Sequence, residues 1–212
     1  MATALGLYND ALMELGEATL SSLSEERKGR RVLDSIYDAV LAECLEAGSW
    51  NFAMRTVQLD ADTGITPAFG YTEVFAKPTD WVRTIGISTD DRFGNSLNRY
   101  WDDVNYLSSD VTPIYFRYVS NNASWGLDLT KWPASFTRFV VVALADRGCM
   151  AITQSESRKD KLERYTLPAA KRRALSRDAM NEGSKFLPMG SWNAARGGGG
   201  RRDGGNRGSL IG

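Results

Sequence analysis

Residues 132–153 read WPASFTRFVVVALADRGCMAIT and carry the clearest structural pattern in the chain. Apolar side chains recur there at three- and four-residue spacing, which is typical of a helix with one buried stripe. Pro133 suits the first position of a helix, where a missing N–H costs nothing. We therefore expect a helix that begins near Trp132 and ends near Thr153. Its predicted buried stripe consists of Phe136, Phe139, Val140, Ala143, Leu144 and Ala151.

A more polar helix is expected directly after this one, over residues 156–181. Pro168 lies inside it and predicts a kink or a break, because proline lacks the N–H that a helix interior uses. The apolar side chains of this helix form a thin line. They are Leu162, Tyr165, Ala169 and Leu175.

Two further helices are predicted at the start of the chain. The first covers residues 3–16 and ends at Gly16. After a short loop, Ser24 is a good N-cap for a second helix that runs to about Ala47, with Gly48 at the position of a C′ glycine. We expect these two helices to form an antiparallel hairpin.

The middle of the chain, residues 49–130, is rich in aromatic, β-branched and turn-forming residues. This composition predicts short strands with long connections. We expect one small antiparallel sheet, with a protruding loop over 89–98. The expected strands cover residues 53–59, 69–76, 82–88, 99–101 and 114–120.

This order of elements predicts an α+β fold, in which helices from both ends of the chain form one bundle and the sheet is inserted between them. The longest apolar run, 139–145, is too short to cross a bilayer, and the N-terminus lacks the features of a signal peptide, so we expect no contact with a membrane. The expected parts are an N-terminal helical hairpin (1–52), an inserted antiparallel sheet (53–130), C-terminal helices of the bundle (131–182) and an extended Gly/Arg-rich arm (183–212).

The formal net charge is zero, but the charges are separated along the chain. Residues 1–170 carry 17 Lys and Arg against 23 Asp and Glu, whereas residues 171–212 carry 9 against 3. An acidic body with a basic extension suggests a partner for the extension: an acidic protein surface, a neighbouring subunit or nucleic acid.

The absence of histidine excludes Ser-His-Asp and Cys-His catalysis and His-ligated zinc. Cys44 and Cys149 lie in apolar stretches, so we expect two buried thiols, with a disulfide as the alternative. Paired acidic residues are predicted to bond within their own turns. We therefore expect a protein that is not an enzyme, with no catalytic residue, cofactor or metal. The acidic pairs are Asp60 with Asp62, Asp90 with Asp91, and Asp102 with Asp103.

The arm combines glycine and arginine with a few apolar side chains. Seven of the thirteen residues in 196–208 are glycine, so we expect this segment to order only when it docks on a partner. The apolar residues are anchors that a solvated tail would not need. The alternatives are a solubilising tail and a tail that binds single-stranded nucleic acid. The predicted docking residues are Phe186, Leu187, Met189, Trp192, Arg196, Arg201, Arg202, Arg207, Leu210 and Ile211.

Five local motifs follow one another between residues 3 and 182. They are Tyr8-Asn9-Asp10-Ala11-Leu12, Trp50-Asn51-Phe52, Phe75-Ala76-Lys77-Pro78-Thr79-Asp80-Trp81-Val82-Arg83, Tyr115-Phe116-Arg117-Tyr118-Val119 and Trp132-Pro133-Ala134-Ser135-Phe136. In this order and spacing the chain resembles the tail tubular protein A family of short-tailed bacteriophages and the related head-completion adaptors. The residues that carry the resemblance are Trp50, Pro78, Asp80, Trp81, Trp132, Pro133 and Phe136.

The resemblance implies a structural head-to-tail adaptor of the virion, assembled in the host cytoplasm. Its subunits would form a homo-oligomeric ring, expected to be twelvefold, between the portal protein and a tail nozzle protein of the tubular protein B type. Double-stranded DNA would pass through the ring without sequence-specific contact, and residues 183–212 would dock on the portal. The alternative function is a nucleic-acid-binding protein that uses the Arg/Gly-rich tail.

Overall fold

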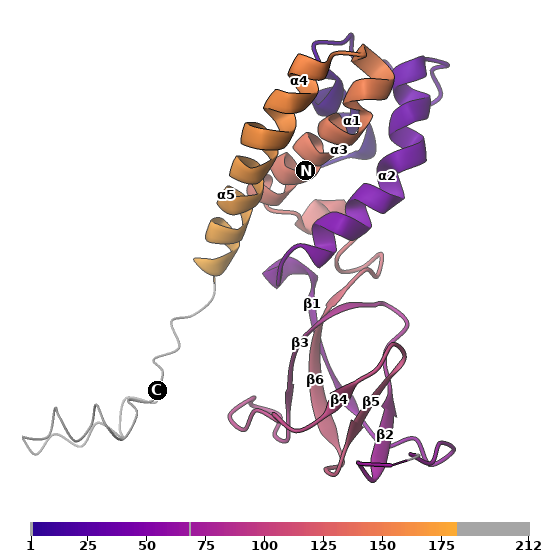
Figure 1. The fold of residues 1–212 in the computed structure, drawn as a ribbon, viewed down its shortest axis with the longest axis vertical. Helices are drawn as coiled ribbons and strands as arrows, with labels where there is room; N and C mark the ends of the chain where they lie inside the picture. The colour runs from indigo at the N-terminus through magenta and orange to yellow at the C-terminus, as the bar shows by residue number, and fades with distance from the viewer. Residues whose placement is uncertain (1, 68, 182–212) are drawn as a thin grey trace, which may run out of the picture. The chain divides into compact units, whose positions relative to one another are not determined.

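The computed structural model describes residues 2–67 and 69–181, which form helices and antiparallel strands (Figure 1). The α+β class expected from the sequence is confirmed. The helices are α1 (Ala4–Glu14), α2 (Lys28–Glu46), α3 (Ala134–Thr153), α4 (Glu156–Lys161) and α5 (Leu167–Ala179). Short helical turns cover Asn51–Ala53, Leu129–Lys131 and, as a π-helix, Leu162–Thr166. The strands are β1 (Met54–Leu59), β2 (Glu73–Ala76), β3 (Trp81–Ser88), β4 (Trp101–Asp102), β5 (Tyr106–Ser109) and β6 (Ile114–Ser120).

Helices from both ends of the chain pack around α3. The first two helices touch through Tyr8, whose hydroxyl donates to Asp34 at 2.8 Å, but each lies mainly against α3 rather than against the other. Because α3 has neighbours on several sides, it buries Val141 and Val142 in addition to most of the predicted stripe. Ala151, which we predicted to be buried, is exposed, because the last turn of α3 directs Cys149 and Ile152 toward the core instead.

The end of α1 follows the prediction. Gly16 adopts a left-handed conformation with φ of 67°, which glycine reaches without a steric cost. The N–H groups of Gly16 and Glu17 donate to the carbonyls of Met13 and Leu12 at 3.0 and 2.9 Å. These two bonds form a Schellman motif and satisfy carbonyls that the helix end would otherwise leave unpaired.

The predicted N-cap at Ser24 is wrong, because α2 begins four residues later, at Lys28. The residues between Ser24 and Lys28 belong to a separate turn. In it the Glu25 carboxylate accepts the N–H of Ser21 at 2.8 Å, and the Glu25 carbonyl accepts from Nε of Arg30 at 2.8 Å. A carboxylate that closes its own turn is not available to the start of the helix, so the sequence pattern misplaced the boundary.

The irregularity predicted at Pro168 is present, but the chain neither stops nor breaks there. A π-helical turn directly precedes the proline, and the N–H of Leu167 donates to the carbonyl of Leu162, five residues back. This wider turn lets a residue without an N–H enter the helix. Gly48 packs against the same helix, since a Cβ there would lie 2.6 Å from Cδ2 of Leu175. Glycine at this position therefore leaves room for Leu175. The backbone of Gly48 does not have the positive φ that we expected of a C′ glycine.

Two small antiparallel sheets replace the single sheet that we expected. The first has the strand order β1-β6-β3, and the second has the order β2-β5-β4. The central strand of the second sheet, β5, was not predicted, because Ser108 and Ser109 have the composition of a turn. The structure buries both serines. Strand β2 is also shorter than expected and begins at Glu73, while β4 begins at Trp101.

The two faces of β6 contact different cores. Phe116 and Tyr118 belong to a small apolar cluster that also contains Phe75 and Leu107 from the second sheet. Val119, on the opposite face of β6, belongs to the large cluster of the helices. Alternation along one strand therefore couples the helices to the sheets.

The loop predicted over 89–98 is present and closes on itself. The Asp90 carboxylate accepts from the hydroxyl of Ser88 at 2.5 Å and from the N–H groups of Gly94 and Asn95 at 3.0 and 2.8 Å. Arg117 of β6 stacks on the ring of Phe93 at 4.1 Å. The acidic pair at 90–91 thus lies in a turn, where its first member organises the backbone.

None of the helices in the described part of the chain is long and apolar enough to span a membrane.

Candidate interaction surfaces

The motif residues Trp50, Trp132 and Phe136 meet in one aromatic cluster at the junction between helices and sheets. The Phe136 ring lies 4.8 Å from that of Trp50 and 5.0 Å from that of Trp132, both edge-on. Phe52 adds a fourth ring to the cluster, 4.7 Å from Phe136. Pro133 is the N-cap residue of α3, which begins at Ala134, so the proline lies just before the first helical position, where we expected it. The four aromatic residues have a packing role.

Trp132 also fixes the chain that leaves the first sheet. Its indole N–H donates to the carbonyl of Gly126 at 2.8 Å. A Cβ on Gly126 would lie 2.0 Å from the carbonyl oxygen of Ser120, so the two backbone segments can approach only because residue 126 is glycine. The tryptophan therefore connects the start of α3 to the end of β6 through this glycine.

Asp80 is the most heavily hydrogen-bonded carboxylate of the motif residues. It accepts from Ser120 at 2.5 Å, Tyr118 at 2.9 Å and Arg55 at 2.9 Å, and it is 9% exposed. Burial by itself raises the pKa of this carboxyl, but the hydrogen bonds outweigh burial and hold the pKa below its ordinary value. The partners come from β1 and β6, so Asp80 connects the turn before β3 to the other two strands of the first sheet.

Pro78 and Trp81 belong to that same turn. The N–H of Trp81 donates to the carbonyl of Pro78 at 3.1 Å, which closes the turn, and the indole N–H donates to the Thr84 hydroxyl at 3.1 Å. The ammonium group of Lys77 lies 3.8 Å from the centre of the Trp81 ring. The proline, the acid and the tryptophan of the motif thus set the geometry in which β3 begins.

The acidic pairs do not converge on one site. Asp62 accepts the N–H of Gly64 at 2.9 Å within its own turn, and Asp102 forms an ion pair with Lys77. Among the described residues, no group of three or more acidic or cysteine side chains is placed to hold a metal ion. Cys44 and Cys149 are buried free thiols, and burial raises the pKa of Cys44 to about 12, with a smaller contribution from Glu43.

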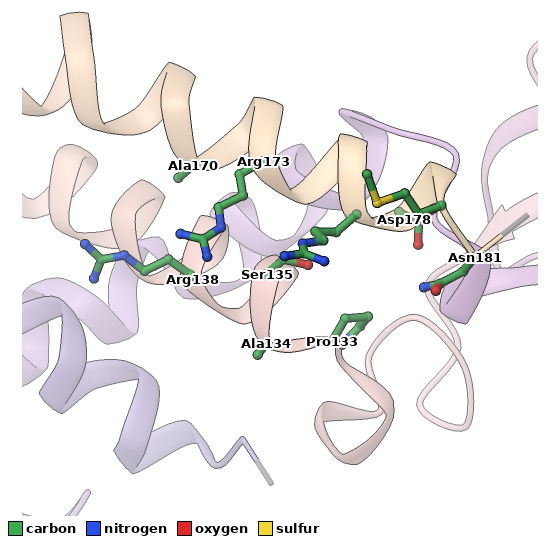
Figure 2. A pocket seen from close by; sticks show the side chains of 10 residues that line it. Pro133, Ala134, Ser135, Arg138, Ala170, Arg173, Asp178 and Asn181 are labelled. Carbon is green, nitrogen blue, oxygen red and sulfur yellow. The ribbon is translucent and has the colours of Figure 1, made fainter.

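A basic cleft lies between the first turns of α3 and the C-terminal half of α5, and Figure 2 shows its lining. Its volume is about 490 Å³. Arg173 extends from α5 toward α3, from which Arg138 projects (Figure 2). The cleft is lined by Pro133, Ala134, Ser135, Arg138, Ala170, Arg173, Arg177, Asp178, Met180 and Asn181.

Two of the three arginines in this basic cleft have no acidic partner in the described part of the chain. Arg138 pairs with Glu14 at 2.6 Å, whereas Arg173 and Arg177 form no ion pair or hydrogen bond there. Asp178 also lines the cleft, but it is buried and its carboxylate faces Asn51, whose backbone N–H it accepts at 3.1 and 3.2 Å. Among the lining residues, positive charges therefore outnumber negative ones.

The sequence held a signal for this basic cleft that we did not use. Arg173 and Arg177 are four residues apart and so lie on one face of a helix. Their approach to Arg138 depends on the packing of α5 against α3, which the pattern of either helix alone does not give.

An exposed aromatic group lies on the second sheet and the chain before it. The ring of Trp101 lies 5.3 Å from that of Phe69 and 5.4 Å from that of Tyr71, both edge-on. Phe69 is 73% exposed and Trp101 43% exposed. Gly70, with φ of 89°, lies under the Trp101 ring, and a Cβ there would lie 2.9 Å from that ring. Clustered exposed aromatic rings are a common feature of interaction surfaces.

The predicted docking residues of the arm, Phe186 to Ile211, lie outside the described residues.

No protein-family model matches the chain, and no curated protein matches it.

Proposed function

We propose that this chain is a subunit of a head-to-tail adaptor ring of a short-tailed bacteriophage, which joins the portal to the tail nozzle. In this proposal helices from both ends of the chain form the bundle of the subunit, and residues 183–212 form the arm that docks on the portal. Twelve copies would surround a channel through which double-stranded DNA passes. The protein would act by binding rather than by catalysis.

The observation that carries the proposal is the role of the residues on which the resemblance rests. Trp50, Trp132 and Phe136 pack at the junction of helices and sheets, and Asp80 connects three strands. Residues that hold a fold together, spaced along the chain as in the adaptor family, support a shared architecture.

The surfaces of the described residues also suit an interaction protein. The aromatic group around Trp101 and the basic cleft beside Arg173 differ in chemistry, and they involve different elements. A subunit that joins neighbours in a ring and also contacts a portal and a nozzle needs several distinct surfaces. This supports an adaptor more than a protein with one ligand.

Native mass spectrometry of the full chain, alone and with the candidate portal ring, tests the proposal. We expect a fixed multiple of twelve copies on the portal ring, and no attachment when residues 190–212 are deleted. Circular dichroism of the deletion variant controls for folding, since the deletion removes none of the described residues. A chain that ignores the portal but shifts single-stranded DNA in a gel, in a tail-dependent manner, would replace the adaptor with the nucleic-acid-binding alternative.

A further inference from the structure

From the basic cleft we infer that the adaptor recognises an acidic segment of the protein to which its arm attaches. Carboxylate side chains of that segment would bind Arg173 and Arg177 in the cleft between α3 and α5. This inference rests on the proposed function for the identity of the partner, but the binding chemistry stands on the described residues alone.

Within the described residues, the positive charges of the cleft lie close together. Arg173 and Arg177 are one helical turn apart, and like charges at this spacing weaken a helix. Arg138, across the cleft on α3, adds a third positive charge that Glu14 balances in part. An anion from another molecule that binds between these arginines would relieve the repulsion between their charges.

Guanidinium groups suit carboxylates in particular, because two parallel N–H donors match the two oxygens of the anion. The walls of the cleft add apolar surface from Pro133, Ala170 and Met180. An acidic side chain that enters the cleft on a peptide would bring methylene groups to these walls as well as its charge to the arginines.

A segment of protein fits the cleft better than a nucleic acid does. Residues 2–181 carry 21 Lys and Arg against 24 Asp and Glu, so the positive charge is confined to the cleft and does not extend along a path that a strand could follow. Nucleic-acid surfaces instead carry positive charge along the path of the strand. A cleft of about 490 Å³ has the scale of a side-chain site, not of a strand-length channel.

The cleft and the predicted arm are close together in the sequence. Met180 and Asn181 line the cleft, and the predicted arm begins at residue 183. Residues 182–212 carry 5 Lys and Arg against 2 Asp and Glu, so the arm has the same sign of charge as the cleft. An acidic surface on the partner would complement the charge of both.

Binding of a fluorescein-labelled oligoglutamate peptide to the full chain tests the chemistry. We expect wild-type protein to bind it, and the double variant Arg173→Glu/Arg177→Glu to bind at least about tenfold more weakly, as two exposed ion pairs would give. The matched control is Lys171→Glu/Arg172→Glu, which makes the same change in charge on the same helix at exposed residues outside the cleft. The control should keep wild-type affinity within about twofold, since it removes long-range attraction alone.

Folding is controlled with Arg173→Gln/Arg177→Gln, which removes the charge without reversing it and should also lose peptide binding, while its thermal unfolding temperature does not fall. Equal loss in the cleft variant and the control would show that net charge alone attracts the peptide and would overturn the inference. So would a wild-type protein that ignores oligoglutamate, or one that binds oligothymidine more tightly through the same arginines.

Attachment to the portal ring separates this inference from the proposed function. Loss of attachment in Arg173→Glu/Arg177→Glu but not in Lys171→Glu/Arg172→Glu would support both. Attachment by all three proteins would leave the adaptor function in place and overturn the acidic partner site. If wild-type protein attaches to no portal ring, the adaptor function fails, and peptide binding still decides whether the cleft accepts carboxylates.

Discussion

The helices bury a large apolar cluster around α3, whereas the two sheets share a cluster of six buried residues. Beside that smaller cluster, Asp80 accepts hydrogen bonds from three side chains, and Asp90 and Asp62 organise turns. The helical region is therefore stabilised mainly by apolar burial. The sheet region depends more on directed polar contacts, each of which one substitution can remove.

This difference predicts where each region is vulnerable. Apolar burial is spread over many side chains, so single substitutions in the helices have large effects only at residues with many neighbours. A buried carboxylate, in contrast, leaves several donors unpaired when it is lost. The junction around Trp132 belongs to both regions, so a substitution there should not distinguish between them.

The largest effect is expected at the junction. Trp132→Ala removes a buried ring that contacts Phe136 and a hydrogen bond to Gly126, and should cost about 3–5 kcal/mol of unfolding free energy. Urea unfolding of this variant measures the loss. The control is Trp125→Ala, because Trp125 is 38% exposed and its loss should cost less than about 0.5 kcal/mol. Similar values for the two variants would mean that the Trp132 ring does not connect the regions.

A smaller effect, confined to the sheets, is expected at Asp80. Asp80→Asn weakens the bonds from Ser120, Tyr118 and Arg55 and should cost about 1–3 kcal/mol. Hydrogen exchange should accelerate in β1, β3 and β6 more than in α3. The control Asp91→Asn changes an exposed residue of the turn after β3 and should leave exchange unaltered.

The cost at Asp80 should also depend on pH. The pKa of its carboxyl is lower in the folded chain than its ordinary value of 3.8, so the ionised form favours folding. The stabilisation is complete above the unfolded pKa and disappears as the pH falls through the folded one. Wild-type protein and Asp80→Asn should therefore approach each other in stability below about pH 4. A difference that stays constant into acid would show that charge is not the cause.

The smallest effect is expected within the helices, at Pro168. The π-helical turn over Leu162–Thr166 already accommodates this proline, so Pro168→Ala should change the unfolding free energy by less than about 1 kcal/mol. Thermal unfolding measures the change. Ala170→Pro, which places a proline inside α5 without such a turn before it, should cost about 3 kcal/mol. A large loss in Pro168→Ala would mean that the proline itself is needed to place α5 against α3.

The sequence by itself determined the fold class, most helix bounds and the strands with strong β-branched and aromatic composition. The apolar spacing in 132–153 predicted α3, Gly16 predicted the end of α1, and the run over 114–120 coincides with β6. These features are local, because helical spacing, left-handed glycine and β-branched composition act within a few residues of the chain. For the same reason the sequence identified the motif residues but did not predict which residues they contact.

Tertiary structure decided the features that depend on residues far apart. β5 is a strand because β2 and β4 pair with it on both sides, although its serines have the composition of a turn. Asp80 gains its partners from two other strands. The basic cleft likewise exists because α5 lies against α3, and Arg138 is more than thirty residues from Arg173 in the sequence. Such contacts are set by packing between elements, which local patterns do not encode.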